Sequence, residues 1–108
     1  MNTDRKGFAE IDVNTSGDNT IIAAPSVGHI EIDHMEIMPT GGANTVRVKL
    51  DGASGTIGFQ YAFDDNQAYV YDRTTQNSIE LKEATALILN LSASTAVTGF
   101  VQYRIVGE

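Results

Sequence analysis

The sequence contains no cysteine and no tryptophan, only two prolines, and half as many basic as acidic residues. Without cysteine, disulfide bonds and thiolate metal sites are excluded, and so is a small secreted scaffold that depends on disulfides. Without tryptophan, any platform for stacking sugar rings has to be built from tyrosine. No apolar run is long enough to span a bilayer, and the N-terminal residues lack the apolar core of a signal peptide. We therefore expect a soluble protein made in the cytosol, with no membrane partner.

Basic residues are scarce and scattered. Fourteen acidic and seven basic residues give a formal net charge of −7, and the only near-pairs of basic residues are Arg5 with Lys6 and Arg47 with Lys49. Such a surface repels phosphate backbones and offers no basic patch. The composition therefore argues against direct binding to nucleic acid.

Short segments of alternating apolar and polar residues fill most of the chain, and each is followed by a turn signal. Alternation with a period of two predicts β-strands, and no window has convincing helical periodicity. The last two segments are the most apolar, and the short polar link between them predicts a β-hairpin. The expected strands are residues 8–13, 20–24, 27–38, 45–50, 56–63, 67–71, 78–83, 87–91 and 97–105.

The long segment 27–38 changes its apolar phase. Ile30 and Ile32 share one parity, whereas Met35 and Ile37 have the other. A slip of one residue within a continuous strand predicts a β-bulge or a strand that crosses between sheets.

Many short strands at regular spacing indicate a sandwich or barrel, and short links indicate antiparallel pairing. A chain of 108 residues fits one domain. We therefore predict an all-β protein with a single antiparallel β-sandwich of eight or nine short strands in residues 11–108, preceded by a polar N-terminal arm in residues 1–10.

Few residues suggest reactive chemistry. On a regular strand His29 and His34 point to opposite faces, so they do not hold a metal together. Glu31 and Asp33 share a face with His29, which suggests a weak cation site, although a solvated outer face accounts for the pattern better. We predict no metal and no cofactor.

A second acidic group, Asp64 and Asp65 followed by Asn66, has Asp72 nearby in sequence. Oxygen ligands of this kind suit Ca²⁺, and two carboxylates suit acid–base hydrolysis. The spacing matches no calcium loop, however, and ordinary turn chemistry explains the group. We expect no enzymatic activity.

Tyr61, Tyr69 and Tyr71 lie in neighbouring predicted strands. They suit a platform for sugar rings, but packing in the core or across strands explains them about equally well.

The order of segments from Asn19 onward resembles that of a known group of proteins. Residues 21–25 (IIAAP) lead into the long Ile-x-Ile strand, a Thr-Gly-Gly loop and residues 45–50 (TVRVKL), and the chain closes on residues 87–103, LILNLSASTAVTGFVQY. This pattern resembles small β-sandwich virion proteins of tailed bacteriophages that decorate, or cement, the capsid exterior.

The resemblance implies a jelly-roll-like structural protein, a homotrimer that clamps subunits of the major capsid protein on the virion surface after synthesis in the host cytoplasm. The N-terminal segment would order against a neighbour by strand addition. Self-association or capsid contact would cover apolar residues that face outward. The residues expected at these contacts are Arg5, Lys6, Phe8, Ile88 and Phe100. The alternative hypothesis is a glycan- or receptor-binding module of a phage tail or fibre, which would use the tyrosines.

Overall fold

The computed structural model describes residues 5–74 and 76–107. The described residues form strands and connecting loops, and contain no helix that is long and apolar enough to cross a membrane. The strands are β1 (Arg5–Val13), β2 (Gly17–Ile22), β3 (His29–Thr40), β4 (Asn44–Lys49), β5 (Gly58–Phe63), β6 (Tyr69–Asp72), β7 (Ile79–Glu80), β8 (Leu87–Leu91) and β9 (Ala96–Val106).

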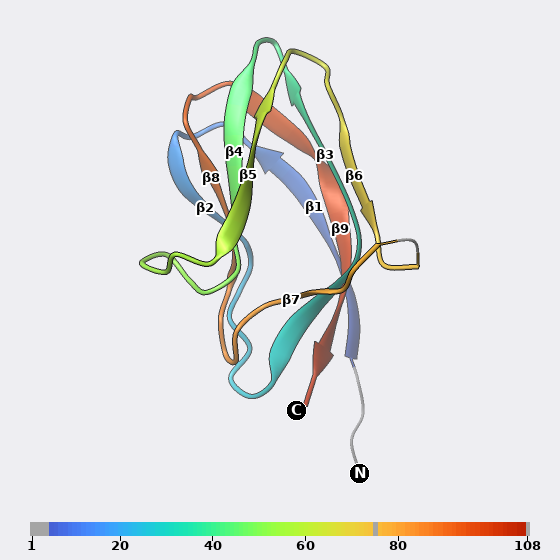
Figure 1. Ribbon diagram of the computed structural model, residues 1–108. Helices are drawn as coiled ribbons and strands as arrows, with labels where there is room; N and C mark the ends of the chain where they lie inside the picture. Colours follow the sequence, from blue (N-terminus) through green and yellow to red (C-terminus); the bar gives the residue numbers. More distant parts are fainter. Residues whose placement is uncertain (1–4, 75, 108) are drawn as a thin grey trace.

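The strands form two antiparallel sheets that pack face to face (Figure 1). The larger sheet has the order β1-β9-β3-β6, with the short β7 also paired to β3, and the smaller has the order β2-β8-β4-β5. Eight main strands in this order form a jelly roll, a double-sheet sandwich. The predicted β-sandwich is confirmed.

Alternation along each strand builds the core between the sheets. The inward side chains of both sheets are mostly aliphatic, and at the centre most are fully buried. Burial of each such side chain stabilises the folded state by roughly 1.5–3 kcal/mol. The core includes Ile11, Ile30, Ile32, Met35, Ile37, Val46, Val48, Leu87, Leu89, Leu91, Val97 and Val101.

The predicted hairpin is wrong, because β8 and β9 lie in different sheets. Both strands turn an apolar face inward, and these faces meet across the core rather than lying side by side in one sheet. The buried side chain of Asn44 stabilises the crossing link by donating hydrogen bonds to the carbonyls of Ala93 (3.0 Å) and Thr95 (2.9 Å).

The predicted slip in the long strand is a register shift in β3 between Ile32 and His34, opposite β9. The extra residue at this β-bulge, Asp33, reverses the parity of everything after it. His29 and His34 therefore lie on the same, outer face of the sheet, and the expectation that they point to opposite faces is wrong.

β1 begins at Arg5, earlier than the expected domain boundary at residue 11. Its residues pair with β9 in an unbroken register, from Arg5 opposite Ile105 to Val13 opposite Val97. Residues 5–10 of the expected arm thus belong to the sandwich, and residues 1–4 lie outside the described part of the chain.

Candidate functional site

The two outer faces of the sandwich differ in chemistry. The face of the smaller sheet is polar, and several of its groups bond to other groups of the chain. Lys49 Nζ lies 2.9 Å from Asp18 Oδ1 and donates to the Ala53 carbonyl oxygen at 2.7 Å. Asn90 Nδ2 also donates to Asp18 Oδ1, at 2.7 Å. A face whose polar groups already have partners within the chain gains little from contact with another molecule.

Ile88 lies on this polar face but is only 5% exposed. Its cross-strand neighbours are Thr20 on β2 and Lys49 on β4, and the Lys49 side chain is itself only 12% exposed. Ile88 thus faces outward as expected, but the polar side chains beside it leave only 5% of it exposed, so it offers little surface for a contact.

The outer face of the larger sheet carries a row of stacked rings. Phe8 on β1 stacks on Phe100 on β9, with ring centroids 5.7 Å apart and ring planes inclined by 19°. Phe100 stacks in turn on the His34 ring on β3, at 5.5 Å and 16°. We call these three residues the ring row. It crosses the sheet from its edge strand to its centre, and its first member, Phe8, is 62% exposed.

Carboxylates flank the inner end of the ring row. His34 Nε2 lies 2.8 Å from Glu36 Oε2, and His34 Nδ1 lies 3.4 Å from Asp72 Oδ2 on β6. The bond to Glu36 and, to a smaller extent, the bond to Asp72 raise the pKa of His34. Hydrogen bonds from the side chain and the backbone of Thr74 lower the pKa of Asp72, which keeps it ionised.

The same face carries further apolar surface. Val70 on β6, which is 49% exposed, lies opposite Glu36 in the sheet. A shallow hollow of about 170 Å³ lies between Phe100 on β9 and Ala68 beside β6, and Met38 also lines it. The structure thus brings two of the predicted contact residues, Phe8 and Phe100, together on one face, with Lys6 beside them on β1.

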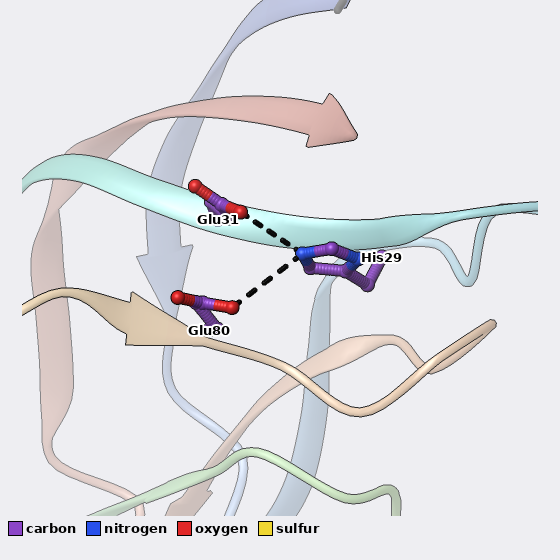
Figure 2. Close-up of side chains that lie close together, drawn as sticks. All are labelled: His29, Glu31 and Glu80. Carbon is purple, nitrogen blue, oxygen red and sulfur yellow. Dashed lines mark hydrogen bonds and ion pairs between the residues drawn. The ribbon is translucent and has the colours of Figure 1, made fainter. Parts of the chain in front are cut away.

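A group of ionisable residues lies elsewhere on this sheet, where β7 pairs with β3 (Figure 2). Glu31 and Glu80 are opposite each other in the register, an arrangement that is unfavourable for two carboxylates. His29 Nε2 approaches both, at 2.9 Å from Glu31 Oε2 and 3.7 Å from Glu80 Oε1. One nitrogen and two carboxylate oxygens within 4.8 Å of one another have the composition of a zinc site.

Two arginines already occupy the other oxygen of Glu31. Arg73 Nη1 lies 3.1 Å and Arg104 Nη2 lies 3.4 Å from Glu31 Oε1, and both arginines also bond to Asp33 Oδ1. Their charge disfavours a metal cation a few ångströms away. We therefore interpret the group as an ion-pair network that attaches β7 to β3. Of the predicted acidic partners of His29, Glu31 contacts it, whereas Asp33 bonds to the arginines.

The acidic turn at residues 64–66 is a hydrogen-bonded loop. Asp65 Oδ1 accepts a bond from the Gly41 backbone N–H at 3.0 Å, and the Asn66 N–H bonds to the Pro39 carbonyl oxygen at 2.9 Å. Asp72 lies at the far end of β6 and bonds to Thr74. The structure therefore does not bring Asp72 to this turn, and turn chemistry accounts for the acidic residues.

The tyrosines line a groove where the two sheets part, between the edge strands β5 and β6. The groove has a volume of about 480 Å³ and its lining includes Phe59, Tyr61, Tyr69, Gln76 and Asn77. The rings of Tyr61 and Tyr69 lie 4.9 Å apart, and desolvation is the main reason that the pKa of Tyr69 rises to about 12.

Tyr71 does not contribute a free ring to this groove. It is 2% exposed, its hydroxyl donates to the Asn77 carbonyl oxygen at 2.7 Å, and the same hydroxyl accepts a bond from the Ile79 N–H at 3.0 Å. Of the three predicted tyrosines, only Tyr61 and Tyr69 present surface to a ligand, and Tyr71 packs in the core.

Comparison with known proteins adds no assignment, because no protein-family model matches the chain and no curated protein matches it either.

Proposed function

We propose that this protein is a non-enzymatic structural protein of a phage virion, which decorates the capsid exterior and stabilises contacts between subunits of the major capsid protein. The proposal rests on the resemblance in strand and turn order described above. The physical observation that supports it is the contrast between the two outer faces. Both carry bonded polar groups, but only the outer face of the larger sheet also carries the ring row and Val70.

A sheet face with exposed aromatic and aliphatic side chains suits adhesion to another protein surface. Aromatic residues supply much of the binding energy in protein interfaces, and each cluster needs a surrounding rim that excludes water. Here Glu10, Glu36 and Asp72 can form such a rim around Phe8 and Phe100. The acidic rim also favours a partner surface that carries basic residues.

The test is to mix the purified protein with capsids that lack it and to measure binding and the release of packaged DNA on heating. We expect the protein to bind and to raise the temperature of release. Val70→Ser should weaken binding about fivefold or more if the outer face of the larger sheet is the contact. Ile57→Ser is the matched control, because Ile57 is 57% exposed but lies in the loop before β5. Failure of the unmodified protein to bind or stabilise these capsids would overturn the proposal.

A second candidate is a glycan- or receptor-binding module of a phage tail or fibre, which the tyrosine groove favours. Adjacent aromatic rings beside side-chain amides match the alternating apolar and hydroxyl surfaces of a sugar. Glycan-array screening followed by calorimetry tests this candidate. Binding that is lost in Tyr61→Ala but kept in Phe8→Ala would support it, and silence across a broad panel would remove it.

A further inference from the structure

β1 forms an unusually open edge of the larger sheet. Within the part of the chain that the structure describes, β1 pairs with β9 alone, and its other side has no strand. Edge strands are normally protected by short length, proline, a bulge or charged side chains. β1 has nine residues, an unbroken register and no proline, whereas the other three edges of the two sheets, β2, β5 and β6, have six, six and four residues. Its backbone is therefore available for pairing with another strand.

Positively and negatively charged side chains lie in opposite halves of β1. On the outer face of β1, Lys6 lies on one side of Phe8, and Glu10 and Asp12 lie on the other. All four side chains are exposed, and among residues 5–74 and 76–107 none of the three charged ones takes part in an ion pair. A strand with a positive first half and a negative second half repels a parallel copy of itself in register, but complements an antiparallel one.

We propose that β1 pairs in antiparallel fashion with β1 of a second copy of this chain, about a two-fold axis at Phe8. Lys6 and Glu10 are each two residues from Phe8, so this register places Lys6 of each copy opposite Glu10 of the other. Both ion pairs lie on the outer face, and a two-fold interface makes each contact twice. The two copies of Phe8 face each other at the axis.

This register also covers the most exposed aromatic ring. Phe8 already stacks on Phe100, so two facing copies extend the ring row of each sheet into one row that crosses both. Opposed side chains on antiparallel strands have Cβ atoms roughly 4.5–5.5 Å apart, which suits packing of two aromatic rings. The result is one continuous sheet formed by the larger sheets of the two copies, and the outer faces of these two sheets point to the same side. A capsid protein would then meet a doubled adhesive surface, but the pairing stands independently of the capsid role.

Because the chain has no cysteine, cross-linking through a single introduced cysteine tests the register directly. Phe8→Cys should form a disulfide-linked dimer on oxidation, because the two Cys side chains would face each other. Asp12→Cys is the matched control on the same exposed face. In this register its two copies lie about 25 Å apart along the strands, too far for a disulfide. Cross-linking of Asp12→Cys as readily as Phe8→Cys would overturn the register.

Charge reversal tests the ion pairs by sedimentation equilibrium. We expect a dimer for the unmodified chain and a dissociation constant about tenfold or more higher for Lys6→Glu and for Glu10→Lys. The double variant Lys6→Glu with Glu10→Lys should recover most of the affinity, whereas Lys6→Glu with Asp12→Lys should not. A monomer, the trimer that the resemblance implies, or a dimer that ignores Lys6→Glu would overturn the proposal. None of these results decides the capsid assay, because Val70 lies on β6, at the opposite edge of the sheet from β1.

Discussion

Asn44 at the start of β4 donates a hydrogen bond from Nδ2 to the carbonyl oxygen of Thr95, at 2.9 Å, across the link between the two sheets. The same amide donates to the Ala93 carbonyl, and its oxygen lies 3.2 Å from Ser92 Oγ and from the Ala93 N–H. The side chain is 4% exposed and its hydrogen-bonding capacity is filled. A single buried amide thus fixes the path of the chain from β8 to β9.

Asn44→Ala should lower the free energy of unfolding by about 2–4 kcal/mol, because backbone groups of the crossing link lose their partner in a site that water reaches poorly. Asn90→Ala is the matched control: Asn90 donates to Asp18 on a more exposed face and should cost about 1 kcal/mol. Urea denaturation of both variants measures the difference. Equal costs for the two variants would show that Asn44 does not have the role assigned to it.

The link between β8 and β9 is also where the sequence-based prediction of a hairpin failed. Alternation in residues 87–91 and 97–105 correctly identified two strands and their buried faces. It carries no information on whether two successive strands lie side by side or face each other across a core. That choice depends on partners distant in sequence, because β8 pairs with β2 and β4 whereas β9 pairs with β1 and β3. By contrast, the bulge in β3 was predictable, because the phase slip between Ile32 and Met35 is a local signal.

Gly99 in the middle of β9 allows close contact between strands. Its φ is +151°, and a Cβ at this position would lie 1.8 Å from the Glu36 carbonyl oxygen and 3.1 Å from Ile37 Cα on β3. Backbone atoms cannot move aside as a flexible side chain can. Gly99→Ala should therefore cost about 3 kcal/mol or more, the sum of backbone strain and overpacking.

Gly41 is the control for this substitution. It also has positive φ, +87°, but a Cβ there would meet no atom within 4 Å. Gly41→Ala should cost only about 1–2 kcal/mol, from backbone strain alone. Thermal and urea unfolding of the two variants should therefore differ clearly. If Gly99→Ala proved as stable as Gly41→Ala, the close approach of β9 to β3 would be wrong.

Glu31 is the central acceptor of the ion-pair network at β7. Its side chain is 11% exposed and bonds to His29, Arg73 and Arg104. Glu31→Gln should lower the free energy of unfolding by about 1–3 kcal/mol, because two arginines lose their ionic partner. Glu83→Gln, at a side chain that is 66% exposed and 3.9 Å from His29 Nδ1, should change the free energy of unfolding by at most about 0.5 kcal/mol.

We expect added Zn²⁺ to leave the unfolding temperature unchanged, and an increase in that temperature that Glu31→Gln abolishes would instead establish a metal site.

The composition of this network was only partly predictable. His29 and Glu31 share a strand, so their proximity follows from alternation alone. Glu80, Arg73 and Arg104 come from distant segments, and the pairing of β7, β6 and β9 with β3 brings them to Glu31. The ring row has the same origin. Phe8 and Phe100 were predicted separately as contact residues, but their stacking requires the pairing of β1 with β9.

His34 should make the stability of the fold depend on pH. Its pKa is raised, chiefly by Glu36 and then by Asp72, so the folded state binds the proton more tightly than the unfolded state. The stabilisation is fully present below the unfolded pKa of about 6.5 and is lost as pH rises through the higher folded pKa. The neighbours of the ring on β9, Phe100 and Gln102, carry no charge.

The measurement compares the unmodified chain with His34→Gln by urea denaturation at a series of pH values below and above about 6.5. The ring of His34 also packs on Phe100, so the variant loses this packing and is less stable at every pH. Only the way in which the stability difference changes with pH therefore reports on the charge of His34. We expect the stability difference between the two proteins to shrink as pH rises above about 6.5. Phe100→Leu removes the stacked ring without removing an ionisable group, and its cost should stay constant with pH. A difference for His34→Gln that stays constant or grows with pH would mean that protonated His34 is not stabilised by Glu36 and Asp72.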